Sequence, residues 1–146
     1  MRVVGLDLGA KRVGVAVSDP RGTVATPYTV LQRAGRRADD HRAVARLVEE
    51  LEAARVVVGL PLSLDGSTGP AARSALEEAE QLRTVLDVPV ELHDERLTTV
   101  SADRSLLLMS VKGGARRKVV DQVAAAVLLQ SWLDSRVTRP SSGSGD

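Results

Sequence analysis

Acidic residues end several stretches of the sequence that are otherwise apolar, and carboxylates in such places are candidates for catalysis or metal binding. Asp7 interrupts the valine-rich stretch VVGLDL, and Asp94 and Glu95 end the stretch VELHDE. Asp121 follows two valines in VVDQVAA. Sites in open α/β sheets form outside the carboxyl ends of the parallel strands. We therefore expect these acidic side chains to meet at one edge of a sheet, with Asp121 approaching from a helix.

A group of carboxylates in one place favours a divalent cation. Clustered carboxylates repel one another, which raises their pKa values unless positive charge neutralises them. Oxygen ligands without a His or Cys set favour Mg²⁺ or Mn²⁺ over zinc. One such ion, or two about 4 Å apart, activates a water and stabilises the leaving oxygen of a phosphodiester. The acidic residues therefore predict metal-dependent phosphodiester hydrolysis.

Each acidic residue also has a structural interpretation. Asp121 lies in the first turn of an expected helix, where a carboxylate favours the positive end of the helix dipole. Asp94 fits the following turn, and Glu95 could pair with Arg96 on the surface. Asp7 could form a buried ion pair, because an unpaired charge in a buried strand is costly. The three sites together support the metal hypothesis better than any one of them.

Basic residues near these acids are candidates for phosphate contacts. Lys11 and Arg12 follow Asp7 after a turn-prone Gly-Ala pair. Two further basic clusters occupy segments that we expect to be loops: Arg33, Arg36 and Arg37, and then Lys112, Arg116, Arg117 and Lys118. Such side chains neutralise backbone phosphates, although an ordinary solvated loop has the same composition. The predicted phosphate contacts are Lys11, Arg12, Arg116, Arg117 and Lys118.

Composition restricts the class of protein. The 146 residues fit one domain at 1–137, followed by a Pro/Ser/Gly-rich tail at 138–146 that we expect to be disordered. The absence of cysteine excludes disulfides, thiolate metal sites and a catalytic thiol. A net charge of +1 gives no strong overall attraction to nucleic acid. No run approaches the roughly 18 apolar residues of a membrane span, so we expect a soluble, cytoplasmic protein without a membrane partner.

Hydrophobic periodicity predicts a mixed α/β sheet. Short apolar runs at 3–8, 12–18 and 23–31 indicate three consecutive strands. Pro27 marks the third as an edge or bulged strand, because proline cannot donate a ladder hydrogen bond. The rest of the chain alternates between helical stripes and apolar runs. The expected helices are 39–54, 70–86, 98–109 and 119–135, and the expected later strands are 55–60 and 88–94.

Four ordered motifs resemble those of the YqgF (RuvX) family. They are Asp7 in GLDLGAKRVGVAVSD, GLP at 59–61, DERLTT at 94–99 and VVDQVAA at 119–125, and the resemblance covers about residues 2–134. It implies an RNase H-like α/β fold, with a five-stranded mixed sheet in the order 3-2-1-4-5 and helices on both faces. This order agrees with the sequence of elements expected from periodicity.

The same resemblance implies a site and an activity. By motif, Asp7, Glu95 and Asp121 would be catalytic and would bind one or two Mg²⁺ or Mn²⁺ ions. Asp94 is the reserve ligand, because strand alternation points it away from Glu95. Members of the family are described as nucleases that process the 5′ end of precursor 16S rRNA, and formerly as Holliday-junction resolvases. We therefore expect a metal-dependent endonuclease that acts on structured RNA, in ribosomal precursor particles, during ribosome biogenesis.

Three other functions stay open at this point. A Holliday junction resolvase would cut branched DNA as a homodimer, whereas an RNA nuclease could be a monomer. The stretch DLGAKRVGVAVSD also resembles the first phosphate loop of actin-like ATPases, but those enzymes close two domains around the nucleotide and this chain supplies one. A non-catalytic ribosome-assembly factor would bind RNA through Arg116, Arg117 and Lys118 without cleaving it.

Overall fold

Five strands form one mixed sheet in the order β3-β2-β1-β4-β5, as predicted. The computed structural model describes residues 1–98 and 113–138, with side chains described at 1–98 and 120–136. The strands are β1 (Val3–Leu8), β2 (Arg12–Ser18), β3 (Ala25–Gln32), β4 (Arg55–Leu60) and β5 (Val90–Asp94). β1, β2 and β3 pair antiparallel, whereas β4 pairs parallel with both β1 and β5. The strands β1, β4 and β5 therefore end together, at what we call the carboxyl edge of the sheet.

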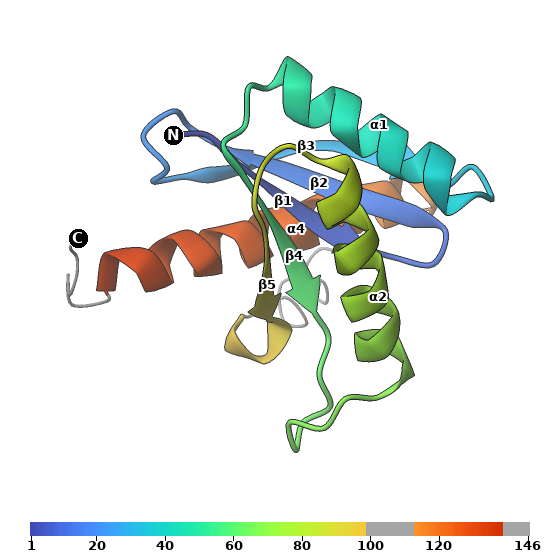
Figure 1. Cartoon of the computed structure of the whole chain (residues 1–146). Coiled ribbons are helices and arrows are strands. Elements are labelled where there is room, and N and C mark those ends of the chain that lie inside the picture. Colours follow the sequence, from blue (N-terminus) through green and yellow to red (C-terminus); the bar gives the residue numbers. More distant parts are fainter. Residues whose placement is uncertain (99–112, 139–146) are drawn as a thin grey trace.

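Helices cover both faces of the sheet, as predicted (Figure 1). α1 (Arg37–Glu50) and α2 (Pro70–Val85) lie on one face, and α4 (Gly113–Thr138) crosses the other. A short 3-10 helix, η1 (Glu95–Leu97), follows β5 directly. In the described part of the chain, no helix has the length and apolar character needed to cross a membrane.

Strand alternation divides β1 between the two faces of the sheet. Val4 and Leu6 are fully buried beneath α1 and α2, while Val3 packs toward α4. Gly5 and Asp7 share the α4 face with Val3, because side chains alternate along a strand. The neighbouring β4 is buried on both faces through its three consecutive valines, as expected for a central parallel strand. The fold thus holds Asp7 on the rigid centre of the sheet, facing α4.

α4 begins earlier than the sequence indicated. We expected a basic loop through residue 118, but the helix begins at Gly113. Ala, Arg and Lys are strong helix formers, so the stretch ARRK extends the helix while the two glycines occupy only its first positions. The prediction of a loop there is wrong. Asp121 consequently lies in the third turn of α4, where the helix dipole no longer accounts for a carboxylate.

Other elements differ from expectation only at their ends. β3 begins at Ala25 because the Asp19 carboxylate builds the preceding turn, accepting hydrogen bonds from the backbone N–H groups of Thr23 and Val24. Pro27 lies in this edge strand at a register shift, as the sequence predicted. The expected helix at 98–109 lies almost wholly outside the described residues, as does the expected tail beyond residue 138. The domain boundaries therefore stay predictions.

Candidate active site

Asp7 lies at the carboxyl edge of the sheet, one residue before the end of β1. It pairs directly opposite Gly14 of β2. The sequence indicated a charge inside a buried strand, but Asp7 is only partly buried, whereas the four residues before it are fully so. The strand therefore fixes the Asp7 backbone while part of the side chain stays accessible to solvent. This position lowers the cost of placing a charge in β1.

Gly14 lets α4 approach the sheet beside Asp7. A Cβ atom at Gly14 would lie 2.2 Å from the backbone oxygen of Asp121, a distance that no side chain tolerates. The bare glycine thus allows the helix backbone to touch β2 at the residue that pairs with Asp7. The contact places Asp121 next to the strand pair that carries Asp7.

The Asp121 carboxylate forms an ion pair with Arg12. Arg12 Nε lies 2.8 Å from Asp121 Oδ2, and both side chains are about a quarter exposed, at 22% and 24%. Arg12 reaches α4 because it shares a strand face with Gly14, two residues further along β2. Sequence reasoning missed this pair. The sequence does place Arg12 and Gly14 on one face of a strand, where a helix could pack closely. The local sequence does not indicate which helix residue packs there.

Glu95 covers the strand on the other side of Asp7. A Cβ atom at Gly59 of β4 would lie 2.5 Å from Glu95 Oε2, so the glutamate side chain lies against this glycine. Gly59 follows Val58, which pairs with Leu6 of β1, and the same register places Gly59 beside Asp7. The two glycines that flank Asp7 are therefore covered by the two other predicted acids.

Asp94, the reserve candidate, is engaged elsewhere. Its carboxylate caps η1 by accepting a hydrogen bond from the Arg96 backbone N–H at 2.9 Å. It also accepts from the Arg96 side chain, with Nη2 at 2.7 Å. Hydrogen bonds from the Arg96 side chain hold the pKa of Asp94 below its ordinary value. From the sequence, Glu95 could pair with Arg96, but in the structure the Arg96 side chain pairs with Asp94.

His93 connects the Glu95 segment to α4. The imidazole is buried, and its Nε2 lies 2.9 Å from Ser131 Oγ. Ser131 in turn donates to the backbone oxygen of Leu97, the last residue of η1. These two contacts join β5, η1 and α4. The sequence did not predict this role for His93, because the spacing of two isolated histidines matches no metal-binding or catalytic motif.

The donor set suits a hard divalent cation, although it is not gathered into a formed site. Three carboxylates from three elements offer only oxygen, which Mg²⁺ and Mn²⁺ prefer. Gly14 and Gly59 allow the Asp121 backbone and the Glu95 carboxylate to lie directly against the strands, where a Cβ atom would collide with them. Among residues 1–98 and 120–136, no three acidic or histidine side chains lie together as a metal-binding group. Asp121 is paired with Arg12 instead.

The predicted phosphate contacts lie around this site. Lys11 is exposed in the turn between β1 and β2, and Arg12 begins β2. The three basic residues at 116–118 lie in α4, within two turns before Asp121. Their side chains fall outside the described part of the chain, so their role in phosphate binding stays a prediction.

Solved structures show which class of fold this is. A Thermus thermophilus RuvC in complex with a Holliday junction substrate superposes with a TM-score of 0.60 at 17% identity, covering 94% of this chain and 97% of that one. A second Thermus thermophilus RuvC structure gives a TM-score of 0.57 at 16% identity, covering 94% and 96%. At this identity the likeness establishes the fold, which is the RuvC-like, RNase H-like α/β fold that the motifs implied.

Sequence comparisons establish the family. The family model for RuvX, described as Holliday junction resolvase, matches residues 1–135. A protein of Mycobacterium sp. (strain KMS) is 53% identical over 137 residues, covering 92% of this chain and 80% of the relative. One from Myxococcus xanthus (strain DK1622) is 50% identical over 135 residues, covering 92% and 89%. Both relatives carry the name "Putative pre-16S rRNA nuclease".

The chain therefore belongs to the RuvX family, as its motifs predicted. Membership also confirms the predicted class of enzyme, a nuclease and thus a hydrolase of phosphodiester bonds.

Proposed function

We propose that this protein is a metal-dependent endonuclease that cleaves structured RNA during 5′-end maturation of precursor 16S rRNA. The relatives' name supports the substrate. The arrangement around Asp7 supports the reaction type, because the Glu95 carboxylate and the Asp121 backbone lie over the two glycines that flank Asp7. A cytoplasmic protein that acts on ribosomal precursor particles fits this role.

One observation carries the proposal: glycine stands on both strands beside Asp7, and each glycine is covered by another acidic residue. A methyl group at Gly59 would collide with the Glu95 carboxylate, and one at Gly14 would collide with the Asp121 backbone. Glycine inside a strand marks a place where another backbone or a ligand approaches closely. These two glycines bring the Glu95 carboxylate and the Asp121 backbone against the strands on either side of Asp7, as a shared site requires.

Each residue then has a defined part in the reaction. When bound, one or two Mg²⁺ or Mn²⁺ ions supply an activated water and positive charge for the leaving oxygen. Asp7 is the rigid ligand, because a central strand positions a side chain better than a loop. Glu95 and Asp121 complete the ligand set from η1 and α4. Lys11 and the basic start of α4 would hold the RNA backbone across the site by neutralising phosphates.

Arg12 has two partners in this scheme. In the structure its guanidinium neutralises Asp121. Because this pair is partly exposed, a substrate phosphate could replace Asp121 as the partner of Arg12, whose planar fork suits a phosphate well. The same side chain thus stabilises the metal-free site and contributes to RNA binding.

A cleavage assay tests the proposal. We would incubate the protein with a precursor 16S rRNA 5′ leader and, separately, a four-way DNA junction, each with Mg²⁺, Mn²⁺ or EDTA. Asp7→Asn should lower RNA cleavage at least about a hundredfold, since a lost metal ligand removes several kcal/mol of transition-state stabilisation. Asp87→Asn is the matched control, because Asp87 is exposed at the opposite end of the sheet, before β5.

A junction resolvase is the second candidate, favoured by the description of the family model and by the RuvC likeness. It predicts cleavage of the DNA junction by a homodimer and no cleavage of the RNA leader. A non-catalytic assembly factor predicts RNA binding that survives Asp7→Asn and no cleavage of either substrate. Equal cleavage by wild type and Asp7→Asn would refute all metal-site assignments made above.

A further inference from the structure

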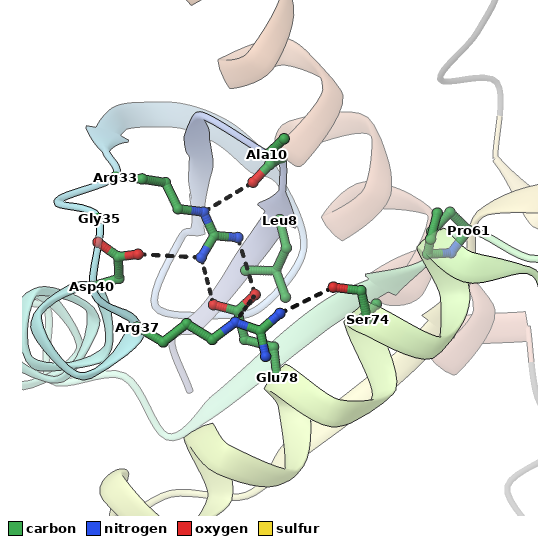
Figure 2. Close-up of a pocket in the computed structure, with 12 residues that line it drawn as sticks. Leu8, Ala10, Arg33, Gly35, Arg37, Asp40, Pro61, Ser74 and Glu78 are labelled. Atoms are coloured by element: carbon green, nitrogen blue, oxygen red, sulfur yellow. Dashed lines mark hydrogen bonds and ion pairs between the residues drawn. The ribbon is translucent and has the colours of Figure 1, made fainter.

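A second group of charged residues lies on the opposite face of the sheet, under α1 and α2, and the candidate active site does not include it. Glu78 of α2 is 2% exposed, and Asp40 and His41 of α1 are 7% and 4% exposed. Arg33, which follows β3, lies between Asp40 and Glu78 (Figure 2). We call Arg33, Asp40, His41 and Glu78 the buried cluster.

Arg33 is held by two carboxylates. Its Nη1 and Nη2 donate to the two oxygens of Glu78 at 2.6 and 3.0 Å, a bidentate pair, and Nη1 also lies 3.3 Å from Asp40 Oδ2. His41 Nε2 lies 2.8 Å from the same Glu78 carboxylate. Bidentate arginine pairs fix the plane of the guanidinium as well as its position. The orientation of the remaining donor, Nε, is therefore determined by the buried cluster.

That remaining donor reaches the turn between β1 and β2. Arg33 Nε donates to the backbone oxygen of Gly9 at 2.9 Å. The Arg33 backbone N–H donates to the backbone oxygen of Lys11 at 3.0 Å. One residue therefore holds both ends of the turn at 9–11, which follows Asp7 and Leu8 and leads into Arg12.

The turn has little other support on this side. A cavity of about 400 Å³ borders Leu8, Gly9 and Ala10 and continues toward α2 (Figure 2). Packed apolar side chains therefore do not fill the space beside the turn. The Gly9 N–H donates to the Asp7 and Arg12 backbone oxygens at 3.1 and 2.9 Å, which closes the turn but does not anchor it to the helices. The Arg33 hydrogen bonds supply that anchor.

Stability alone is a weak reason for such a cluster. A buried ion pair can often be replaced by apolar residues of similar volume with little loss, because desolvation offsets the attraction between the charges. An apolar replacement would, however, leave the Gly9 carbonyl without its donor. The contact that distinguishes Arg33 from an apolar side chain is thus the one made to the turn.

We propose that Arg33, oriented by Glu78 and Asp40, is a positioning residue that holds the β1–β2 turn so that Lys11 and Arg12 face the substrate beside Asp7. The inference rests on the proposed function, because it takes these two side chains as phosphate contacts. It also corrects the interpretation of Arg33 itself. The sequence grouped it with Arg36 and Arg37 as a phosphate-contacting loop, but its side chain is only 14% exposed and its donors are occupied.

Two measurements test the proposal with Arg33→Lys, which keeps the charge but loses the fork. Hydrogen exchange of the amides at 9–12 should become about tenfold or more faster in the variant, while the β4 amides keep their wild-type rates. Binding of the precursor 16S rRNA leader, measured in EDTA from about 50 to 200 mM salt, should weaken about tenfold at low salt. The slope of log affinity against log salt should fall by roughly one to two, as expected for that number of lost phosphate contacts.

A double-mutant cycle separates positioning from a merely structural effect. If Arg33 acts through Lys11, the loss of RNA affinity in Arg33→Lys plus Lys11→Ala should be clearly smaller than the sum of the single losses. Arg55→Lys is the matched control, since Arg55 pairs with Glu91 at the other end of the sheet and makes no contact with the turn. It should change neither the exchange at 9–12 nor the salt slope.

The outcomes are distinguishable. Unchanged exchange in a folded Arg33→Lys overturns the proposal, and so does faster exchange with unchanged RNA affinity. Should this variant not fold, Glu78→Gln, which keeps the shape of the side chain and weakens the grip on Arg33, replaces it with the same expectations. If wild type binds no RNA, the proposed function and the link to Lys11 both fail, but the exchange measurement still shows whether Arg33 holds the turn.

Discussion

Two arginine–carboxylate pairs lie near the carboxyl edge of the sheet, on opposite faces, and they differ in burial and geometry. On the α4 face, Arg12 meets Asp121 through one hydrogen bond, with about a quarter of each side chain exposed. On the other face, Arg33 meets Glu78 through two hydrogen bonds, with 14% and 3% exposed. The contribution of an ion pair falls as its exposure rises: a fully exposed pair contributes about 0–1 kcal/mol, whereas breaking a buried pair costs about 3–5 kcal/mol. The first pair can therefore exchange partners, and the second is suited to hold the chain in place.

The largest expected difference concerns stability. Glu78→Ala should lower the free energy of unfolding by about 3–5 kcal/mol, because Arg33 would be left buried with Asp40 as its remaining carboxylate partner. Asp121→Ala should lower it by no more than about 1 kcal/mol. Urea denaturation of both variants measures this directly. Equal losses would show that the two pairs do not differ in the way proposed here.

The two glycines beside Asp7 offer the next largest effect. A methyl group at Gly14 would meet the Asp121 backbone, which can move only with α4, so Gly14→Ala should destabilise the fold by about 1–3 kcal/mol. At Gly59 it would meet the end of the flexible Glu95 side chain, so Gly59→Ala should cost less than about 1 kcal/mol. Gly59→Ala should nevertheless weaken Mn²⁺ binding by displacing a ligand. Calorimetric titration and thermal melts of both variants separate the two effects, and unchanged Mn²⁺ affinity in Gly59→Ala would count against Glu95 as a ligand.

A smaller effect is expected at Arg12. Because its guanidinium competes with a cation for Asp121, Arg12→Gln should tighten Mn²⁺ binding about three- to fivefold, which corresponds to roughly 1 kcal/mol for an exposed pair. RNA affinity in EDTA should fall in the same variant. Arg55→Gln provides the control, since its partner Glu91 is not among the predicted ligands. Weaker Mn²⁺ binding by Arg12→Gln would mean that Arg12 supports the cation site.

The smallest effect is a pH dependence that belongs to the buried cluster. Burial raises the pKa of Glu78, but hydrogen bonds from Arg33 and His41 and the nearby charge of Arg37 outweigh it, so the pKa lies below the ordinary 4.5. A carboxyl group whose folded pKa is depressed stabilises the fold above its unfolded pKa, and this stability is lost as the pH falls through the folded pKa. The stability of wild type should therefore fall below about pH 4.5 more steeply than that of Glu78→Gln. Urea midpoints between pH 6 and the acid limit of folding measure the difference, and parallel curves would contradict it.

Much of the fold could be predicted because its signals are local. Apolar runs marked the strands, Pro27 marked the edge strand, and ordered motifs implied the strand order that the structure has. The start of α4 could not be placed, because GGARRK carries both loop signals, in its two glycines, and helix signals, in its alanine, arginines and lysine. Glu78 was missed, although it lies in a buried stripe with Ala75 and Leu82 at helical spacing. A charged residue in such a stripe indicates a partner, but its partner Arg33 is 45 residues away.

The candidate site, like the fold, could be predicted only in part from the sequence. By itself, the sequence determined which residues are the candidates for the chemistry: acids at the ends of core elements, with basic residues close behind them. Only the tertiary structure decided that Glu95 and the Asp121 backbone lie over Gly59 and Gly14, and that Arg12 meets Asp121 while Arg33 turns to the opposite face. The physical reason is that residue type and strand period are properties of the chain. Which side chains meet depends on how closely α4 and α2 pack against the sheet. Glycines on the strands and buried charged residues determine these packing distances.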